Sequence, residues 1–290
     1  MTPYKVFVVG HEGTTGLRIH ERLSNRKDIE LLATADEDRK NVEAIKDVAK
    51  GADIVFLCLP DAASKEIMAA IGELPCKVID TSTAFRTASD CHASGMIACI
   101  APLIKAGFVP ADYPFTITSL TGYSGGGKKM IGQYECNPKD YFLYAPHQYG
   151  LSQQHKHLPE VEHVCGLSEA PIFMPIVDDY YSGMEVTVGI HSRLCRKPIS
   201  IDKVQRVLED FYKDSTIITV VPFTDNSNTG MLPANQLSNT DSMKIYVTGN
   251  DERIMVHAIF DNLGKGASGA AVQCMNIALG LPEETGLALG

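Results

Sequence analysis

Three glycines near the start of the chain are spaced for phosphate binding. Gly10, Gly13 and Gly16 follow an apolar run at residues 5–9 and open a segment of helical pattern. That order predicts a strand, a tight turn and a helix. Gly10 would allow the turn, Gly13 the close approach of a pyrophosphate, and Gly16 close packing of the helix on the strand. A strand-to-helix turn without a ligand would give the same pattern.

Polar residues around this turn could hold the rest of a dinucleotide. The hydroxyl of Thr14 or Thr15 can bind a phosphate or cap the helix, whose first N–H groups face the same place. Arg39 and Lys40 follow a second strand-like run at residues 30–35. Cations at this position accommodate a 2′-phosphate. The sequence therefore predicts NADP as the cofactor, with a solvated charged loop as the alternative reading.

Cys91 is the cysteine best placed to act as a nucleophile. It stands shortly before an apolar segment of helical pattern at residues 96–106. The positive end of a helix dipole lowers the pKa of a thiol and favours the thiolate. An inert buried cysteine is the alternative. The other seven cysteines form no CxxC pair, so the sequence predicts neither a zinc cage nor a redox pair, and we expect reduced thiols.

Two histidines, His155 and His157, are candidates for moving a proton at such a thiolate. They precede a helix-like segment that begins near residue 158, and they lie in no apolar run, so a core role is not favoured. A positioned imidazole is the commonest general acid or base. The sequence contains no HExxH or comparable spacing of ligands, and we predict no metal.

The glycine-rich segment at residues 122–129 is a candidate anion site that contains Ser124 and Lys128. Consecutive backbone N–H groups can form a nest for an anion, and a lysine adds charge. A phosphorylated substrate or a cofactor phosphate would fit such a nest, and a flexible hairpin is the alternative.

The elements that would position these residues fall into two groups. Alternating strand and helix patterns fill the first 80 or so residues and predict a doubly wound parallel sheet, which binds ligands beyond the carboxyl ends of its strands. The later pattern is α+β, with strands expected at residues 115–120, 172–177, 184–190, 215–221, 242–248 and 253–260. A helix expected at residues 269–279 should return to the first group. We predict domains at 1–90 with 263–290 and at 91–262.

Composition and charge exclude several classes of protein. Hydrophobic residues make up 44% of the 290 residues and charged residues 21%, which is typical of a globular chain. The formal net charge of −9 argues against binding to nucleic acid or to an anionic membrane. The apolar runs are too short to cross a bilayer, and the start lacks the pattern of a signal peptide, so we predict a cytoplasmic location.

Taken together, these motifs resemble those of one enzyme family. They are GHEGTTG at residues 10–16, FLCLPD at 56–61, VIDTSTA at 78–84, CHASG at 91–95, GYSGGGK at 122–128, HKHLPE at 155–160 and DNLGKGA at 261–267. In this order, across nearly the whole chain, they resemble the shorter form of the N-acetyl-gamma-glutamyl-phosphate reductases of arginine biosynthesis. The resemblance to aspartate-semialdehyde dehydrogenase is much weaker.

The resemblance implies a fold and a chemistry. The fold would be a Rossmann-type NADP-binding domain, completed by the C-terminal helix, plus an α+β dehydrogenase catalytic domain. Cys91 would attack an acyl phosphate, and His155 would act as acid and base while a thioester is reduced. Homodimers or homotetramers are typical of the family.

The resemblance also assigns further site residues. The additional cofactor-binding residues would be Pro60, Ser82 and Asn262. The substrate would be held by residues among Arg86, Ser124, Lys128 and His157.

One departure from the family pattern lies just before Cys91. Family members carry about twenty more residues after the Ser-Thr-Ala-x-Arg motif, ending in Asn-Pro-Gly, whereas here residues 86–90 run directly into the cysteine. This segment was either omitted from the sequence or truly deleted. A true deletion would favour a non-catalytic NADP-binding protein, and activity on aspartyl phosphate would favour aspartate-semialdehyde dehydrogenase.

Overall fold

The computed structural model describes residues 2–82, 84–85, 91–223 and 230–290. Its internal contacts divide the chain into two compact units. Unit 1 comprises residues 1–90 and 267–287, and unit 2 comprises residues 91–266 and 288–290. The division lies close to the predicted domain boundaries.

Unit 1 is built on a parallel sheet with the strand order β2-β1-β3-β4. Its strands are β1 (Tyr4–Val9), β2 (Ile29–Leu32), β3 (Ile54–Leu57) and β4 (Lys77–Asp80). Its helices are α1 (Thr14–Ser24), α2 (Val42–Ala49), α3 (Asp61–Ile71) and α8 (Gly269–Leu279), with a short 3-10 turn η1 (Asp36–Asp38). The predicted doubly wound arrangement is confirmed.

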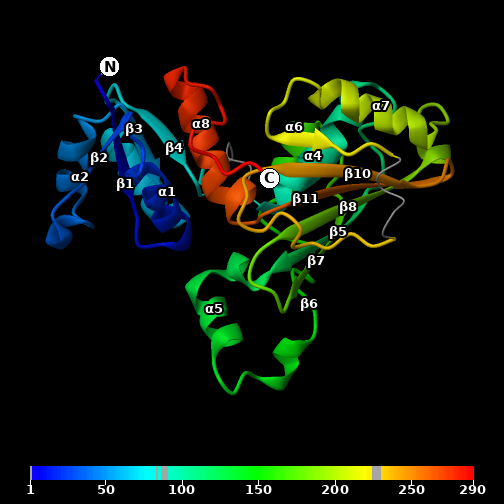
Figure 1. Cartoon of the computed structure of the whole chain (residues 1–290), viewed down its shortest axis with the longest axis horizontal. Helices are drawn as coiled ribbons and strands as arrows, with labels where there is room; N and C mark the ends of the chain where they lie inside the picture. The colour runs from blue at the N-terminus through cyan, green and yellow to red at the C-terminus, as the bar shows by residue number, and fades with distance from the viewer. Residues whose placement is uncertain (1, 83, 86–90, 224–229) are drawn as a thin grey trace. The chain divides into compact units, whose positions relative to one another are not determined.

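Both faces of this sheet are covered, which explains why its strands are apolar throughout. Alternate residues of β1 point to opposite faces, so Val6 and Val8 pack with α1 and α8, while Phe7 and Val9 pack on the side of α2 and α3. Helix α8 lies beside β4 and α1 (Figure 1). Residues 269–279, which we expected to return to the first group, lie in unit 1.

Unit 2 contains a seven-stranded mixed sheet of order β6-β7-β5-β8-β11-β10-β9. Its strands are β5 (Thr116–Gly122), β6 (His147–Gln148), β7 (Ile172–Asp178), β8 (Met184–His191), β9 (Ile218–Val220), β10 (Met243–Gly249) and β11 (Arg253–Phe260). Its helices are α4 (Cys91–Lys105), α5 (Gly127–Glu135), α6 (Leu158–Cys165) and α7 (Ile201–Tyr212). Short helical turns are η2 (Tyr123–Gly126), η3 (Tyr141–Tyr144), η4 (Ser192–Leu194) and the π-turn η6 (Gly264–Ser268).

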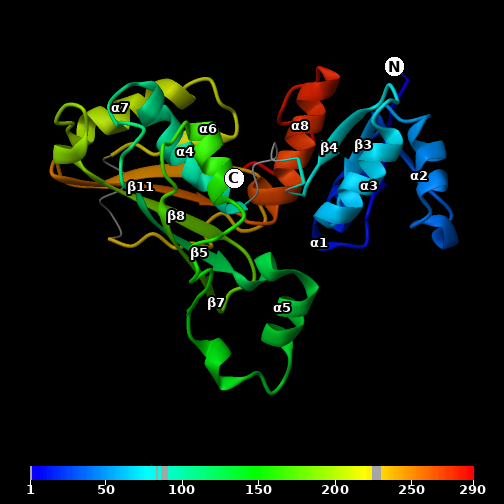
Figure 2. The same cartoon turned by 180° about the vertical axis from the view of Figure 1, so that it is seen from behind.

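Helix α4 is the centre of the packing in unit 2. It lies with α6 and α7 on one face of the sheet, against β8 and β11 (Figures 1 and 2). The approach is close because Gly95 has no side chain: a Cβ there would stand 2.5 Å from Val186. This packing fixes the start of α4, where Cys91 lies.

Several predicted elements differ from the structure. Helix α4 begins at Cys91 rather than at residue 96, and strand β2 ends at Leu32 rather than at residue 35. The glycine-rich segment is a short 3-10 turn that runs into α5, rather than an open loop or hairpin, because helix-forming residues follow Gly127. Strand β9 begins at Ile218 instead of residue 215, since the Ser215 hydroxyl accepts hydrogen bonds from the backbone of Ile217 and Ile218 and holds a turn there. Among the described residues, no helix is both long and apolar enough to span a membrane.

Candidate active site

The predicted glycine turn is present, and two of its glycines are required by the space around them. Gly10 has φ +85°, and a Cβ there would lie 2.4 Å from the carbonyl oxygen of Cys58. At Gly16, a Cβ would lie 2.4 Å from the carbonyl oxygen of Gly10. Gly13 is the N-cap of α1, so the first N–H groups of this helix open beside a residue without a side chain.

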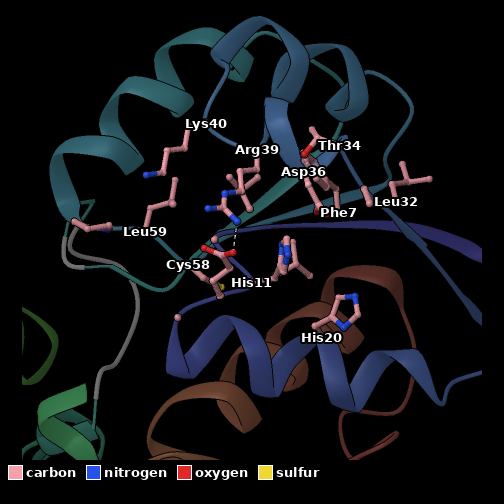
Figure 3. A pocket seen from close by; sticks show the side chains of 17 residues that line it. Phe7, His11, His20, Leu32, Thr34, Asp36, Arg39, Lys40, Cys58 and Leu59 are labelled. Atoms are coloured by element: carbon pink, nitrogen blue, oxygen red, sulfur yellow. Dashed lines mark hydrogen bonds and ion pairs between the residues drawn. The ribbon is translucent and has the colours of Figure 1, made fainter. Parts of the chain in front are cut away.

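A pocket of about 350 Å³ lies over this turn, at the carboxyl ends of β1 and β3. Its lining includes the following predicted residues: Gly10, Gly13, Arg39, Lys40 and Pro60. Figure 3 shows the Arg39 side chain between Lys40 and His11. The Arg39 guanidinium forms an ion pair with Glu12, which belongs to the glycine turn itself. Sequence reasoning passed over Glu12, although it lies between two of the glycines.

Four predicted cofactor residues of unit 1, which are Gly16, Thr14, Thr15 and Ser82, do not line the pocket. Thr14 and Thr15 form the first turn of α1. Ser82 follows β4, where its hydroxyl donates to Asp80 at 2.6 Å and accepts from the backbone N–H of Ala84. The residues that do line the pocket fit a dinucleotide, because they combine a helix N-terminus with two cationic side chains.

In unit 2, Cys91 is the first residue of α4, so its thiol stands at the positive end of a 15-residue helix. The side chain is half-buried. Gly266 lies against it: a Cβ at that position would be 3.1 Å from the Cβ of Cys91. By contrast, burial raises the pKa of the Cys58 thiol to about 12 and that of Cys165 to about 12, which keeps both as inert thiols at neutral pH.

Three histidine rings gather beside the start of α4. The ring centroid of His92, the residue after Cys91, lies 5.6 Å from that of His155 and 5.9 Å from that of His157. His155 and His157 are 4.8 Å apart, and Phe173 of β7 packs edge-on against His155 at 5.1 Å. The fold thus brings both predicted histidines next to His92, the residue that follows the predicted nucleophile.

The two predicted histidines differ in burial, which corrects the sequence analysis. His155 is half-buried, whereas His157 is 1% exposed, so the expectation that neither belongs to the core is wrong for His157. His157 caps α6, and its Nδ1 lies 3.8 Å from Oε2 of the buried Glu160. The backbone N–H of His157 donates to Nδ1 of His155 at 3.4 Å. The sequence pattern did not predict this burial because His157 precedes the buried Val161 by one helical turn and so extends the apolar face of α6.

Two other predicted residues of unit 2 are tied to each other. Asn262 accepts a hydrogen bond from the backbone N–H of Gly183 and donates to the hydroxyl of Ser124 at 3.0 Å. Asn262 and Ser124 are both buried. Lys128 is exposed in the first turn of α5. Arg86 and the shortened segment at residues 86–90 lie outside the described residues.

Sequence reasoning missed the residue that joins this cluster together. His92 is 3% exposed, with Nδ1 hydrogen-bonded to the Ser119 hydroxyl at 2.8 Å and Nε2 to the Tyr149 hydroxyl at 2.6 Å. Burial lowers the pKa of His92 well below its usual value, and His157, His155 and Lys156 add to the effect. The sequence offered one signal for this role, because His92 directly follows the candidate nucleophile Cys91.

Two family profiles match the chain. Residues 5–124 match the semialdehyde dehydrogenase NAD-binding domain, and residues 91–262 match the semialdehyde dehydrogenase dimerisation domain. The N-acetyl-gamma-glutamyl-phosphate reductase of Sinorhizobium medicae (strain WSM419) is 39% identical over 305 residues, covering 95% of this chain and 98% of the relative. The chain belongs to the semialdehyde dehydrogenase family, with the N-acetyl-gamma-glutamyl-phosphate reductases.

Other relatives agree with this placement. N-acetyl-gamma-glutamyl-phosphate reductase 2 of Nostoc sp. (strain PCC 7120) is 35% identical over 325 residues, covering 99% of this chain and all of the relative. Both aligned lengths exceed the 290 residues of this chain, so the relatives carry residues that have no counterpart here. The crystal structure of aspartate semialdehyde dehydrogenase II from Vibrio cholerae shares the fold, with a TM-score of 0.73 at 17% identity, covering 96% of this chain and 99% of that one.

These matches confirm the predicted family, the fold class and the assignment as an oxidoreductase. The first part of the chain is a domain for a nicotinamide dinucleotide. The match of residues 91–262 to a dimerisation domain indicates an oligomer.

Proposed function

We propose that this chain reduces N-acetyl-gamma-glutamyl phosphate to N-acetylglutamate 5-semialdehyde and phosphate, with NADPH as the reductant, as a step of arginine biosynthesis. The observation that carries the proposal is the half-buried Cys91 at the start of α4 beside a histidine cluster, in a chain 39% identical to such a reductase. The finer assignments below are part of the same proposal.

The first step is attack by Cys91. Its thiolate, favoured by the helix dipole, adds to the acyl carbon of the substrate, and the C–O bond to the phosphate breaks. The result is a thioester on Cys91 and free inorganic phosphate. The position at the helix start matters because a thiol without such a stabilising dipole stays protonated: burial raises the pKa of the Cys58 and Cys165 thiols to about 12.

The second step is reduction of the thioester and release of the aldehyde. NADPH, which the residues of the unit 1 pocket would hold, would supply the hydride for this reduction. His155 donates a proton to the developing oxyanion and takes it back when the C–S bond breaks, which regenerates the Cys91 thiolate. General acid–base catalysis of this kind contributes typically about 10² to 10⁴-fold in rate.

We assign the proton transfer to His155, while the predicted substrate contact of His157 stays a prediction. His155 is half-buried, so a substrate can reach its ring, whereas His157 is 1% exposed and is held by Glu160. The backbone N–H of His157 donates to Nδ1 of His155, which orients the His155 ring.

The cofactor we propose is NADP. Arg39 and Lys40 both line the unit 1 pocket and would bind a 2′-phosphate, while Gly13 and the start of α1 would bind the pyrophosphate. The roles of the remaining predicted cofactor residues stay predictions, as do those of the predicted substrate residues.

The direct test measures NADPH formed from N-acetylglutamate 5-semialdehyde plus phosphate, the reverse reaction. The wild-type chain should be active, and the variant Cys91→Ser should be inactive while still binding NADPH. His155→Asn should lose about 10²-fold or more in kcat. A larger loss for His157→Asn than for His155→Asn, with both variants folded, would transfer the proton step to His157.

Aspartate-semialdehyde dehydrogenase is the second candidate, supported by the shared fold. The same assay run with aspartate semialdehyde distinguishes the two, since kcat/KM should favour the acetylated substrate. A non-catalytic NADP-binding protein would bind NADPH and show neither activity. A homodimer or homotetramer and a cytoplasmic location stay predictions; the mass of the native particle would decide the first.

A further inference from the structure

We propose that His92 is a positioning residue, which fixes Tyr149 and through it the ring of His155. The inference rests on the proposed function for its kinetic consequence, but it concerns a residue that the proposed mechanism does not use. It is carried by two hydrogen bonds and by the packing of the rings around them.

His92 joins three segments that are far apart in the sequence. It lies in the first turn of α4, Ser119 lies in the middle of β5, and Tyr149 follows β6. The bonds to the two hydroxyls measure 2.8 and 2.6 Å. Ser119 is fully buried, so this end of the bridge is anchored in the sheet.

The other end of the bridge reaches His155. The Tyr149 ring lies 6.0 Å from the His155 ring, and the backbone N–H of Tyr149 donates to Pro175 on β7. The next residue, Gly150, touches His155 as well: a Cβ there would lie 3.7 Å from Cδ2 of the His155 ring. Tyr149 and Gly150 therefore pack against the His155 ring, and His92 forms a hydrogen bond with the Tyr149 hydroxyl.

The neutral form of His92 suits this role. A neutral imidazole has one donor and one acceptor nitrogen, and each hydroxyl can take either part, so both bonds are made without a buried charge. The groups facing His92 would oppose a second positive charge: His155, His157 and Lys156. A neutral His92 also avoids repelling the proton that His155 carries during the reaction.

The alternative is that His92 only stabilises the fold. The two roles differ in what they change. Loss of a structural residue lowers the melting temperature and leaves kcat and its pH dependence alone in the folded fraction. Loss of a positioning residue lowers kcat and shifts the pH profile, with the affinity for NADPH unchanged, because the cofactor pocket lies in unit 1.

The test compares His92→Leu, His92→Gln and Tyr149→Phe with the control Tyr113→Phe. Tyr113 is a buried tyrosine of unit 2, whereas Tyr149 is half-buried, and the Tyr113 hydroxyl accepts a 2.6 Å hydrogen bond from the backbone N–H of His191, outside the histidine cluster. Tyr149→Phe removes only the hydroxyl, so it keeps the ring and should fold. The readouts are kcat and KM against pH, the Kd for NADPH, and the ¹⁵N shifts of the His155 ring.

We expect Tyr149→Phe and His92→Leu to lower kcat by about 10-fold or more, part of the acid–base contribution. His92→Gln, whose amide reaches the position of Nε2, should recover part of the loss. The ¹⁵N shifts of His155 should change in the Tyr149 and His92 variants and stay constant in Tyr113→Phe, with the Kd for NADPH within about 2-fold throughout.

An active wild-type enzyme whose Tyr149→Phe and His92→Gln variants keep its kcat, pH profile and His155 shifts would overturn this inference and leave the proposed reductase standing. An inactive wild-type chain would overturn the proposed function instead. In that case the ¹⁵N shifts of His155 still report whether His92 and Tyr149 hold its ring.

Discussion

At the level of single residues, the ion pair between Arg39 and Glu12 sets the charge of the cofactor pocket. Glu12 forms an ion pair with the Arg39 guanidinium, which we assign to the 2′-phosphate of the cofactor. The Glu12 carboxylate and the phosphate therefore compete for Arg39. We expect Glu12→Gln to tighten NADPH binding and Arg39→Ala to weaken it by about 10-fold or more, the size of a lost charge-assisted hydrogen bond.

NADH serves as the matched comparison for this prediction, because it lacks the 2′-phosphate. Its Kd should change little in Arg39→Ala. Binding is measured by the fluorescence of the reduced cofactor at fixed ionic strength, since exposed charges are screened by salt. Equal losses for NADPH and NADH would remove Arg39 from the 2′-phosphate site.

The buried His92 predicts a pH dependence of stability as well as of rate. Burial keeps its pKa in the folded chain below the value of about 6.5 that it has when unfolded. The unfolded chain therefore binds more protons, so the contribution of His92 to stability is complete above pH 6.5 and is lost as the pH falls below it.

Replacing His92 with Gln should flatten this dependence. Urea unfolding at pH 7.5 and pH 5.5 measures the effect: wild type should lose more stability between the two values than the variant does. An equal loss in both proteins would mean that His92 is not held neutral.

At the level of elements, the glycine turn before α1 depends on backbone contact. A Cβ at Gly16 would stand 2.4 Å from the Gly10 carbonyl, and neither backbone can move without shifting β1 or α1. We expect Gly16→Ala to destabilise the first unit by about 1–3 kcal/mol. Chemical denaturation monitored by circular dichroism gives this value.

Gly13→Ala is the matched control for that prediction. The nearest atom to a Cβ there is the Gly10 carbonyl oxygen at 3.5 Å, an ordinary contact. Its stability should stay close to wild type. If both alanine variants were equally stable, the close approach of α1 to the turn would not be a constraint on the fold.

Sequence patterns predicted most of these elements because each has a local cause. Residues 253–260 and 269–279 carry the apolar pattern of a strand and a helix, and β11 and α8 occupy those ranges. Strand β9 was predicted too long because a side-chain hydrogen bond from Ser215, which periodicity does not register, ends the extended backbone. Helix α5 was missed because its glycines outweighed its helix-forming residues.

The site was less predictable than the fold, since it is made by contacts between distant segments. The glycine turn and Cys91 were found because their positions relative to a helix start can be read locally. The link from His92 to Tyr149 spans 57 residues, and the Glu12–Arg39 pair spans 27, so no spacing rule points to either.

At the scale of the whole molecule, the last part of the chain is held to the first by Arg26. Its side chain donates to Asn276 at 2.8 Å, to the backbone oxygen of Thr285 at 3.0 Å, and to Asp28 at 2.6 Å. The guanidinium is buried, with a side-chain exposure of 7%. Arg26→Ala should therefore cost roughly 2–3 kcal/mol in the stability of unit 1.

Hydrogen exchange locates the effect of that substitution. Protection should fall in α8 and in the segment after it, while unit 2 stays protected. Lys50→Ala, which breaks an exposed ion pair with Asp47, is the control and should leave exchange unchanged. Unchanged protection of α8 in Arg26→Ala would show that apolar packing alone holds the C-terminal helix.

The proposed reaction passes through a thioester at Cys91, and mass spectrometry detects this thioester most directly. The purified chain is mixed with N-acetyl-gamma-glutamyl phosphate in the absence of NADPH and quenched in acid. We predict a mass increase of one N-acetylglutamyl group on the peptide that contains Cys91, released phosphate in equal amount, and loss of the adduct when NADPH is added. An active enzyme with no adduct on that peptide, or with the adduct retained in Cys91→Ser, would contradict the account.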